Sequence, residues 1–205
     1  MASRPPGRKP PHRRPPRNGA AQRAAAPPPQ RPEAPSMRRR LALLGYKLPE
    51  VKAPAFKYVP VVVHGGLAYV SGQVPWAGGE IMSPGKVDRE VSIEQAQEAA
   101  RACVLQALAW LDQTLSGLDE VERAVRMTAY VASSPGFGQQ PAVADAASEV
   151  LLKIFGHAGQ HTRAAIGVAE LPRNAPVEIE LVFALKRPSG PAPRPRGFPV
   201  VEKRR

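Results

Sequence analysis

The sequence has a single cysteine and few aromatic residues, and it lacks any long apolar run. One thiol, Cys103, excludes an internal disulfide and is typical of proteins from a reducing compartment. No apolar stretch reaches the length of about eighteen residues that a membrane-spanning helix needs. Residues 1–30 are basic but contain no apolar segment, which argues against a secretory signal. These absences predict a cytoplasmic protein that does not enter a membrane.

Proline and basic residues are concentrated at the two ends of the chain. Residues 1–36 contain 11 of the 25 prolines and 8 basic side chains against one acid, and residues 186–205 contain 5 prolines and 7 basic side chains against one acid. Residues 41–185 hold 11 basic and 15 acidic side chains, so the net charge of +12 belongs to the ends. This excludes a basic globular domain that grips nucleic acid with its folded surface.

The composition divides the chain into a disordered Pro/Arg-rich tail at 1–36, a folded domain at 37–186 and a disordered basic tail at 187–205. The tails have too few large apolar side chains to offset the entropy of ordering. The first tail has three open interpretations: a transit peptide, a polyproline or RNA-binding arm, or sequence upstream of a start at Met37. Any contact with nucleic acid is expected through the tails only.

The apolar pattern of the domain begins with a hairpin and a long helix. Residues 58–63 and 67–71 are β-branched runs around a glycine turn, which predicts two paired strands. A second hairpin or an irregular loop that carries Trp76 follows. Ser92, with Gln95 three residues on, gives a capping box for a helix that stops at Gly117.

The rest of the domain is predicted to contain one strand, a second helix and two final strands. Residues 121–131 predict a half-buried strand with Val125 on its buried face, and residues 142–155 predict a second helix. Residues 163–168 and 177–185 predict two final strands joined by a proline-containing turn. This order predicts an α+β fold in which one sheet carries both helices on one face. The other face has to be covered, so we expect a homo-oligomer.

One pair of residues in the last two predicted strands indicates a site that binds a carboxylate and activates water. Arg163 and Glu178 are fifteen residues apart, and a turn centred near Asn174 would give them the same strand parity and one shared face. The forked donors of a guanidinium match a carboxylate, and a nearby glutamate can orient or deprotonate water. A plain cross-strand ion pair is the alternative.

Three segments of the domain resemble one known family. Residues 70–75 read VSGQVP, residues 163–172 read RAAIGVAELP, and residues 175–180 read APVEIE. In this order and spacing they resemble the RidA family, also called YjgF or L-PSP, across residues 41–186. The resemblance implies a chorismate-mutase-like α+β fold and a homotrimer with three clefts between subunits.

The resemblance also implies an activity, the hydrolysis of reactive 2-imino or 2-enamino acids to 2-oxo acids and ammonia without a metal or cofactor. It implies that Arg163 binds the substrate carboxylate and that Glu178 positions the attacking water. It also implies that the backbone of Gly72 and Ala165 lines the cleft. Ala165 stands where the family often has a cysteine. The family's early G-P-Y-S motif is missing, and Tyr58 is the nearest match to its substrate-binding tyrosine.

Two other functions remain open. The first is a trimer that binds a carboxylate ligand without catalysis, and the second is an RNA-binding or endoribonuclease-like protein helped by its basic tails. His157 and His161 are spaced like metal ligands, but they follow the second helix and have no acidic or thiol partner near in sequence, so no metal site is expected.

Overall fold

The computed structural model describes residues 35–51 and 57–186; the predicted tails, except Pro35 and Ser36, and residues 52–56 lie outside this part of the chain. Its elements are three α-helices, seven strands and three short 3-10 turns. The helices are α1 (Met37–Leu43), α2 (Ile93–Leu115) and α3 (Gln140–Phe155). The strands are β1 (Val61–His64), β2 (Leu67–Gln73), β3 (Trp76–Ala77), β4 (Glu80–Ile81), β5 (Val121–Ala132), β6 (Thr162–Val168) and β7 (Val177–Leu185). The 3-10 turns are η1 (Leu118–Glu120), η2 (Gly156–Gly159) and η3 (Pro172–Asn174).

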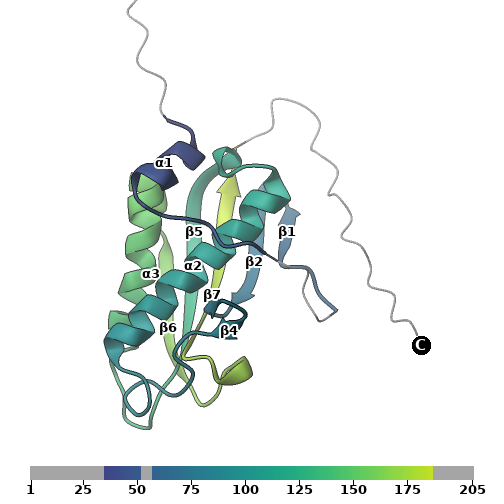
Figure 1. Ribbon diagram of the computed structural model, residues 1–205. Helices are drawn as coiled ribbons and strands as arrows, with labels where there is room; N and C mark the ends of the chain where they lie inside the picture. Colours follow the sequence, from purple (N-terminus) through teal and green to yellow (C-terminus); the bar gives the residue numbers. More distant parts are fainter. Residues whose placement is uncertain (1–34, 52–56, 187–205) are drawn as a thin grey trace, which may run out of the picture. The chain divides into compact units, whose positions relative to one another are not determined.

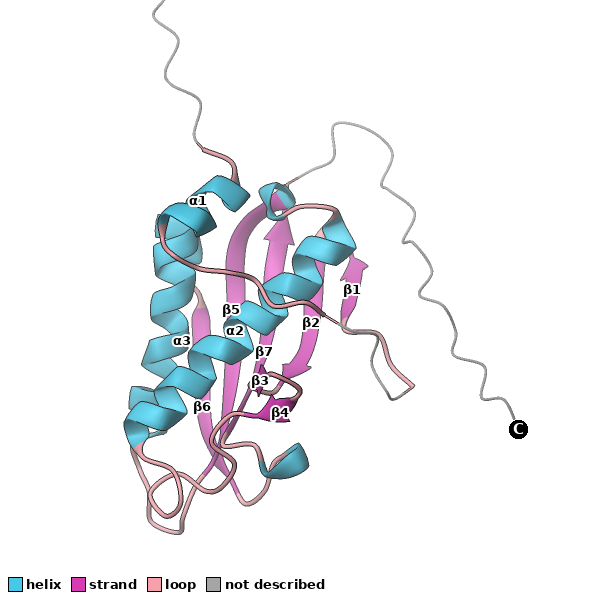
Figure 2. Cartoon of the chain, viewed as in Figure 1, coloured by secondary structure: helices cyan, strands magenta, loops and turns pink. Residues whose placement is uncertain are grey.

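Five strands form one mixed sheet in the order β1-β2-β7-β5-β6, and β3 and β4 form a separate small hairpin. Strand β6 runs parallel to β5, while the other neighbours in the sheet are antiparallel. Helix α2 packs on β2 and β7, and α3 packs on β5 and β6, so both lie on one face of the sheet (Figure 1). No helix of the described residues covers the other face, which we call the open face (Figure 2). The predicted α+β layer is therefore confirmed.

Local signals account for the helices. The Ser92 side chain accepts a hydrogen bond from the Gln95 backbone, and the Gln95 side chain accepts one from the Ser92 backbone. This capping box satisfies two backbone donors at the start of α2. Ser116 ends α2 in the left-handed conformation, one residue before the predicted Gly117. Helix α3 begins with a proline in its first turn, as predicted. No helix in the described residues is apolar and long enough to cross a bilayer.

Helix α1 was not predicted. Its N-cap Ser36 accepts a hydrogen bond from Arg39, and Leu41 is buried. The backbone N–H of Met37 donates to Asp119 at 2.8 Å, which ties the helix to the end of α2 and η1. With only seven residues, α1 carries too few apolar positions for a recognisable period.

The core lies between the sheet and α2 and α3. Most of its members are apolar side chains from the inner faces of the strands and helices, and Val87 and Val91 join them from the loop before α2. The largest fully buried members include Phe183, Leu108, Leu111, Met127, Leu151, Ile154, Ile179 and Leu181. Cys103 and Trp110 also belong to this core. One prediction is wrong here: a register shift in β5 between Ala124 and Arg126 turns Ala124 inward, and Val125 is only partly buried.

The last two strands are not the hairpin that the sequence suggested, because β5 lies between β6 and β7. Helix α3 connects β5 to β6, and a helical crossover of this kind returns the chain to the starting end of the first strand. Strand β6 therefore joins β5 in parallel at the sheet edge. Turn η3, in which Arg173 and Asn174 have positive φ, leads the chain on to β7 on the other side of β5.

Candidate functional site

Arg163 and Glu178 lie on opposite faces of the sheet, so the prediction that they share a face is wrong. Arg163 pairs in register with Met127, which is buried beneath the helices. Glu178 pairs with Tyr130, three residues further along β5 and therefore on the open face. The prediction failed because it assumed direct pairing of β6 with β7, whereas β5 stands between them and sets both registers.

Arg163 lies on β6, the edge strand, and is held from α3. Its Nη1 donates to Oδ1 of Asp145 at 2.7 Å and to Oγ of Ser148 at 3.0 Å. The side chain of Arg163 is 24% exposed and that of Asp145 is 64% exposed. Ala165, two residues further on, lies on the same side of β6 and packs partly on the core. Arg163 and Ala165 thus form one half of the predicted site.

Ser148 is itself held by His161. Nδ1 of His161 lies 2.7 Å from the carbonyl oxygen of Gly159, and Nε2 lies 3.2 Å from Oγ of Ser148. Since a carbonyl can only accept, Nδ1 carries the proton, and in the neutral ring Nε2 accepts from the Ser148 hydroxyl. The Ser148 oxygen then has lone pairs for Arg163. His161 therefore stabilises the residues around Arg163.

Glu178 and Gly72 form the other half of the predicted site, on β7 and β2. A Cβ atom built at Gly72 would collide with the Glu178 carboxylate, so the glycine leaves the space in which this side chain lies. Burial, followed by the charge of Glu180, raises the pKa of Glu178 above its ordinary value. A carboxylate with a raised pKa is a better proton acceptor for water than an exposed one.

Tyr130 and Glu180 lie with Glu178 on the open face, and neither was predicted to have a role in the site. The Tyr130 hydroxyl donates to Oε2 of Glu180 at 3.0 Å. Burial, followed by this hydrogen bond, raises the pKa of Tyr130. Glu180 has the same strand parity as Glu178, and Tyr130 is the register partner of Glu178 on β5. Strand parity is the signal that could have found them.

Asp145 and Ser148 were missed as well. They are three residues apart on α3, so they lie on one side of that helix. Only the pairing of α3 with β6 brings them to Arg163.

Tyr58 is not brought to Arg163 within one chain. It is 48% exposed and lies just before β1, at the edge of the sheet opposite β6.

The guanidinium of Arg173 lies over the ring of Trp76, 5.1 Å from the ring centre. Together these two residues help to line a hollow of about 330 Å³ beside the β3–β4 hairpin.

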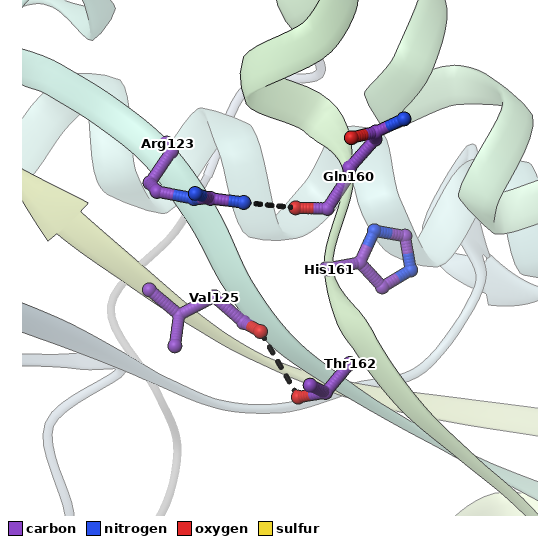
Figure 3. Close-up of a pocket in the computed structure, with 5 residues that line it drawn as sticks. All are labelled: Arg123, Val125, Gln160, His161 and Thr162. Atoms are coloured by element: carbon purple, nitrogen blue, oxygen red, sulfur yellow. Dashed lines mark hydrogen bonds between the residues drawn. The ribbon is translucent and has the colours of Figure 1, made fainter.

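A larger hollow of about 460 Å³ lies at the start of β6 (Figure 3). Arg123 donates to the carbonyl of Gln160 at 3.0 Å, and the Thr162 hydroxyl donates to the carbonyl of Val125 at 3.0 Å. His161 completes the lining. No acidic side chain lines this hollow, and neither Arg163 nor Glu178 does. In the described part of the chain, no group of three or more His, Cys, Asp or Glu side chains is placed to hold a metal ion.

The two-layer fold and the motif residues define a chorismate-mutase-like α+β domain. The chain belongs to the family described as YjgF/chorismate mutase-like, putative endoribonuclease, whose model matches residues 38–185. The resemblance seen in the sequence is thereby confirmed.

Relatives from three organisms support this membership. Protein TCP17 of Trypanosoma cruzi is 40% identical over 146 residues, 71% of this chain and 91% of that protein. The crystal structure of Atu1372 of Agrobacterium tumefaciens, a protein of unknown function, is 39% identical with a TM-score of 0.68 and covers 73% of this chain and 92% of its own. The crystal structure of a putative endoribonuclease from Shewanella oneidensis is 28% identical with a TM-score of 0.71, and the match covers 74% of this chain and 100% of that protein's chain.

Proposed function

We propose that the protein is a homotrimeric hydrolase that converts 2-imino or 2-enamino acids to 2-oxo acids and ammonia. Arg163 holds the substrate carboxylate, and Glu178 orients and deprotonates the attacking water. The observation that carries this proposal is the contact between Gly72 and Glu178. It joins two motif segments about a hundred residues apart and places a carboxylate of raised pKa against bare backbone on an uncovered sheet face.

The placement of the two residues on opposite faces supports a proposed site that is shared between protomers. One chain directs Arg163 to the helix side of an edge strand and Glu178 to the open face, so it cannot present both to one small ligand. The open face also carries exposed apolar side chains, including Tyr69 at 44%, Val62 at 49% and Ile166 at 42%. A second copy that covers this face would bring its own edge strand beside Glu178. Each site then combines Arg163 of one protomer with Glu178 of its neighbour.

The reaction needs only proton transfers. Glu178 takes a proton from water while the oxygen attacks the C=N carbon, and it passes this proton to the imine nitrogen. Glu178 then takes the hydroxyl proton of the tetrahedral intermediate and delivers it to the nitrogen, so that ammonia leaves as the C=O bond forms and Glu178 returns to its carboxylate form. Imino acid and water are thus converted to oxo acid and ammonia with no change in oxidation state, which is why the proposal includes no cofactor.

The name endoribonuclease, carried by the family and by a relative, supports RNA cleavage as a second candidate. The charge of the domain favours the hydrolysis of imino acids over RNA cleavage. Glu178 and Glu180 lie together on the open face, and residues 41–185 carry 15 acidic against 11 basic side chains. A phosphate backbone is repelled by such a surface, whereas a small monocarboxylate needs a single arginine. A trimer that only binds such a carboxylate is the third candidate.

Ammonia release tests the proposed function. An amino-acid oxidase acting on alanine produces 2-iminopropanoate in solution, and the full-length protein is expected to accelerate its conversion to pyruvate and ammonia above the spontaneous rate. Labelled single-stranded RNA is incubated in parallel. Acceleration without RNA cleavage supports the proposal. RNA cleavage without acceleration overturns it in favour of a ribonuclease, and a rise in Tm with pyruvate without turnover overturns it in favour of a binding trimer.

A further inference from the structure

We propose that Asp145 sets the substrate class of this site by disfavouring ligands with a second negative charge. The inference rests on the proposed function, because it takes Arg163 as the anchor for the substrate carboxylate. It predicts that the preferred substrates are imino acids with uncharged side chains, and that dicarboxylic imino acids and phosphorylated ligands bind poorly.

The hydrogen bonds of Arg163 show which part of the guanidinium a ligand can use. Within the described part of the chain, its side-chain hydrogen bonds all leave from Nη1, one to Asp145 at 2.7 Å and one to Ser148 at 3.0 Å. Both N–H groups of Nη1 are thereby used, and the edge formed by Nε and Nη2 keeps its donors for a ligand. A carboxylate fits that edge with two parallel hydrogen bonds. Asp145 and Ser148 therefore orient the guanidinium of Arg163 and leave its Nε–Nη2 edge available to a ligand.

The same contact places a fixed negative charge next to the bound ligand. The Asp145 carboxylate touches the guanidinium that receives the substrate, so the two anions lie within a few ångströms of each other. Because Asp145 is 64% exposed, its pair with Arg163 contributes little to the stability of the fold. Its charge still acts on whatever binds. Arg163 and Asp145 together are neutral, so a second ligand charge meets repulsion without a matching cation.

The other charged residues of α3 are Glu149 and Lys153, and no ion pair within the described residues joins either of them to Arg163 or Asp145. Glu149, next to Ser148, faces Arg101 of α2 at 4.0 Å, and Arg101 is already paired with Glu98 at 2.6 Å. At about 4–5 Å in water-like surroundings, Coulomb's law gives roughly a fivefold penalty for each ligand charge. The second charge of a dicarboxylate lies farther from Asp145, so a dianion would lose up to about 25-fold where a monoanion loses about fivefold.

Calorimetric titration of the full-length protein with pyruvate and with 2-oxoglutarate tests the inference. Asp145→Asn is expected to tighten binding of both, and to raise the affinity for 2-oxoglutarate relative to pyruvate by up to about fivefold. Glu149→Gln removes the same charge from the same helix without touching Arg163, and it should leave this ratio unchanged. Asp145→Ala provides a second variant, and the gain should shrink in high salt.

The outcomes separate this inference from the proposed function. If Arg163→Ala abolishes binding but Asp145→Asn leaves the ratio unchanged or lowers it, the role of Asp145 is wrong and the anchor stands. If Arg163→Ala binds both ligands as the wild type does, the anchor is wrong and the inference falls with it.

Discussion

Arg163→Ala is expected to lower kcat/KM for 2-iminopropanoate by at least about a hundredfold. Two charge-assisted hydrogen bonds to the substrate carboxylate are lost, and each contributes roughly 1.5–3 kcal/mol. The fold should change little, because the ion pair of Arg163 with Asp145 is largely exposed on the aspartate side. The measurement is the initial rate of ammonia release, together with Tm.

Arg101→Ala is the matched control, since Arg101 also forms ion pairs on the helix layer but lies away from β6. It should retain the wild-type rate. Arg163→Lys keeps the charge but loses the fork, so an intermediate rate is expected. Equal rates for Arg163→Ala and wild type would remove Arg163 from the site.

Glu178→Gln is expected to lower kcat by about 10²–10⁴-fold while it raises stability at neutral pH. The activity falls because the amide cannot accept a proton from water. The stability rises because the wild-type carboxylate is partly buried and lies near the charge of Glu180. A loss of activity with a gain in Tm distinguishes a functional carboxylate from a structural one.

The pH dependence of this stability gain follows from the raised pKa of Glu178. The folded state binds this proton more tightly than the unfolded chain, so ionisation of Glu178 destabilises the fold above the folded-state pKa. As the pH falls through that pKa, the wild-type side chain becomes neutral and the advantage of glutamine disappears. Tm curves of the two proteins should converge in acid. Glu122→Gln, at an exposed position of β5, should show no such convergence, and a Glu178→Gln protein less stable than wild type at pH 7 would contradict the assignment.

The two long helices, α2 and α3, and the first hairpin could be predicted because their signals are local. Ser92 with Gln95 starts α2, Gly65 and Gly66 turn β1 into β2, and the apolar stripe around Leu111 has helical spacing. The motif segments were sufficient to predict the family. Each of these signals lies within one element or one turn, where the chain's own geometry decides the outcome.

The relation between Arg163 and Glu178 could not be predicted in this way. Their faces depend on which strand lies between β6 and β7, and that is a choice of long-range pairing. The contacts of Arg163 with Asp145 and Ser148 depend on how α3 packs over β6, which no local pattern encodes. The same contacts hold Arg163 on the helix side of the sheet, which is why the proposed function places the site between two protomers.

Subunit complementation tests the shared site most directly. Arg163→Ala and Glu178→Gln proteins, each inactive alone, are co-expressed in equal amounts with different tags, and oligomers that carry both tags are purified. If each site takes Arg163 from one protomer and Glu178 from its neighbour, mixed trimers should recover about one third of the wild-type rate, because one of the three neighbour pairs in every trimer that contains both variants has both residues intact. If both residues act from the same protomer, every site keeps one lesion, and mixed oligomers as inactive as their parents would contradict the shared site.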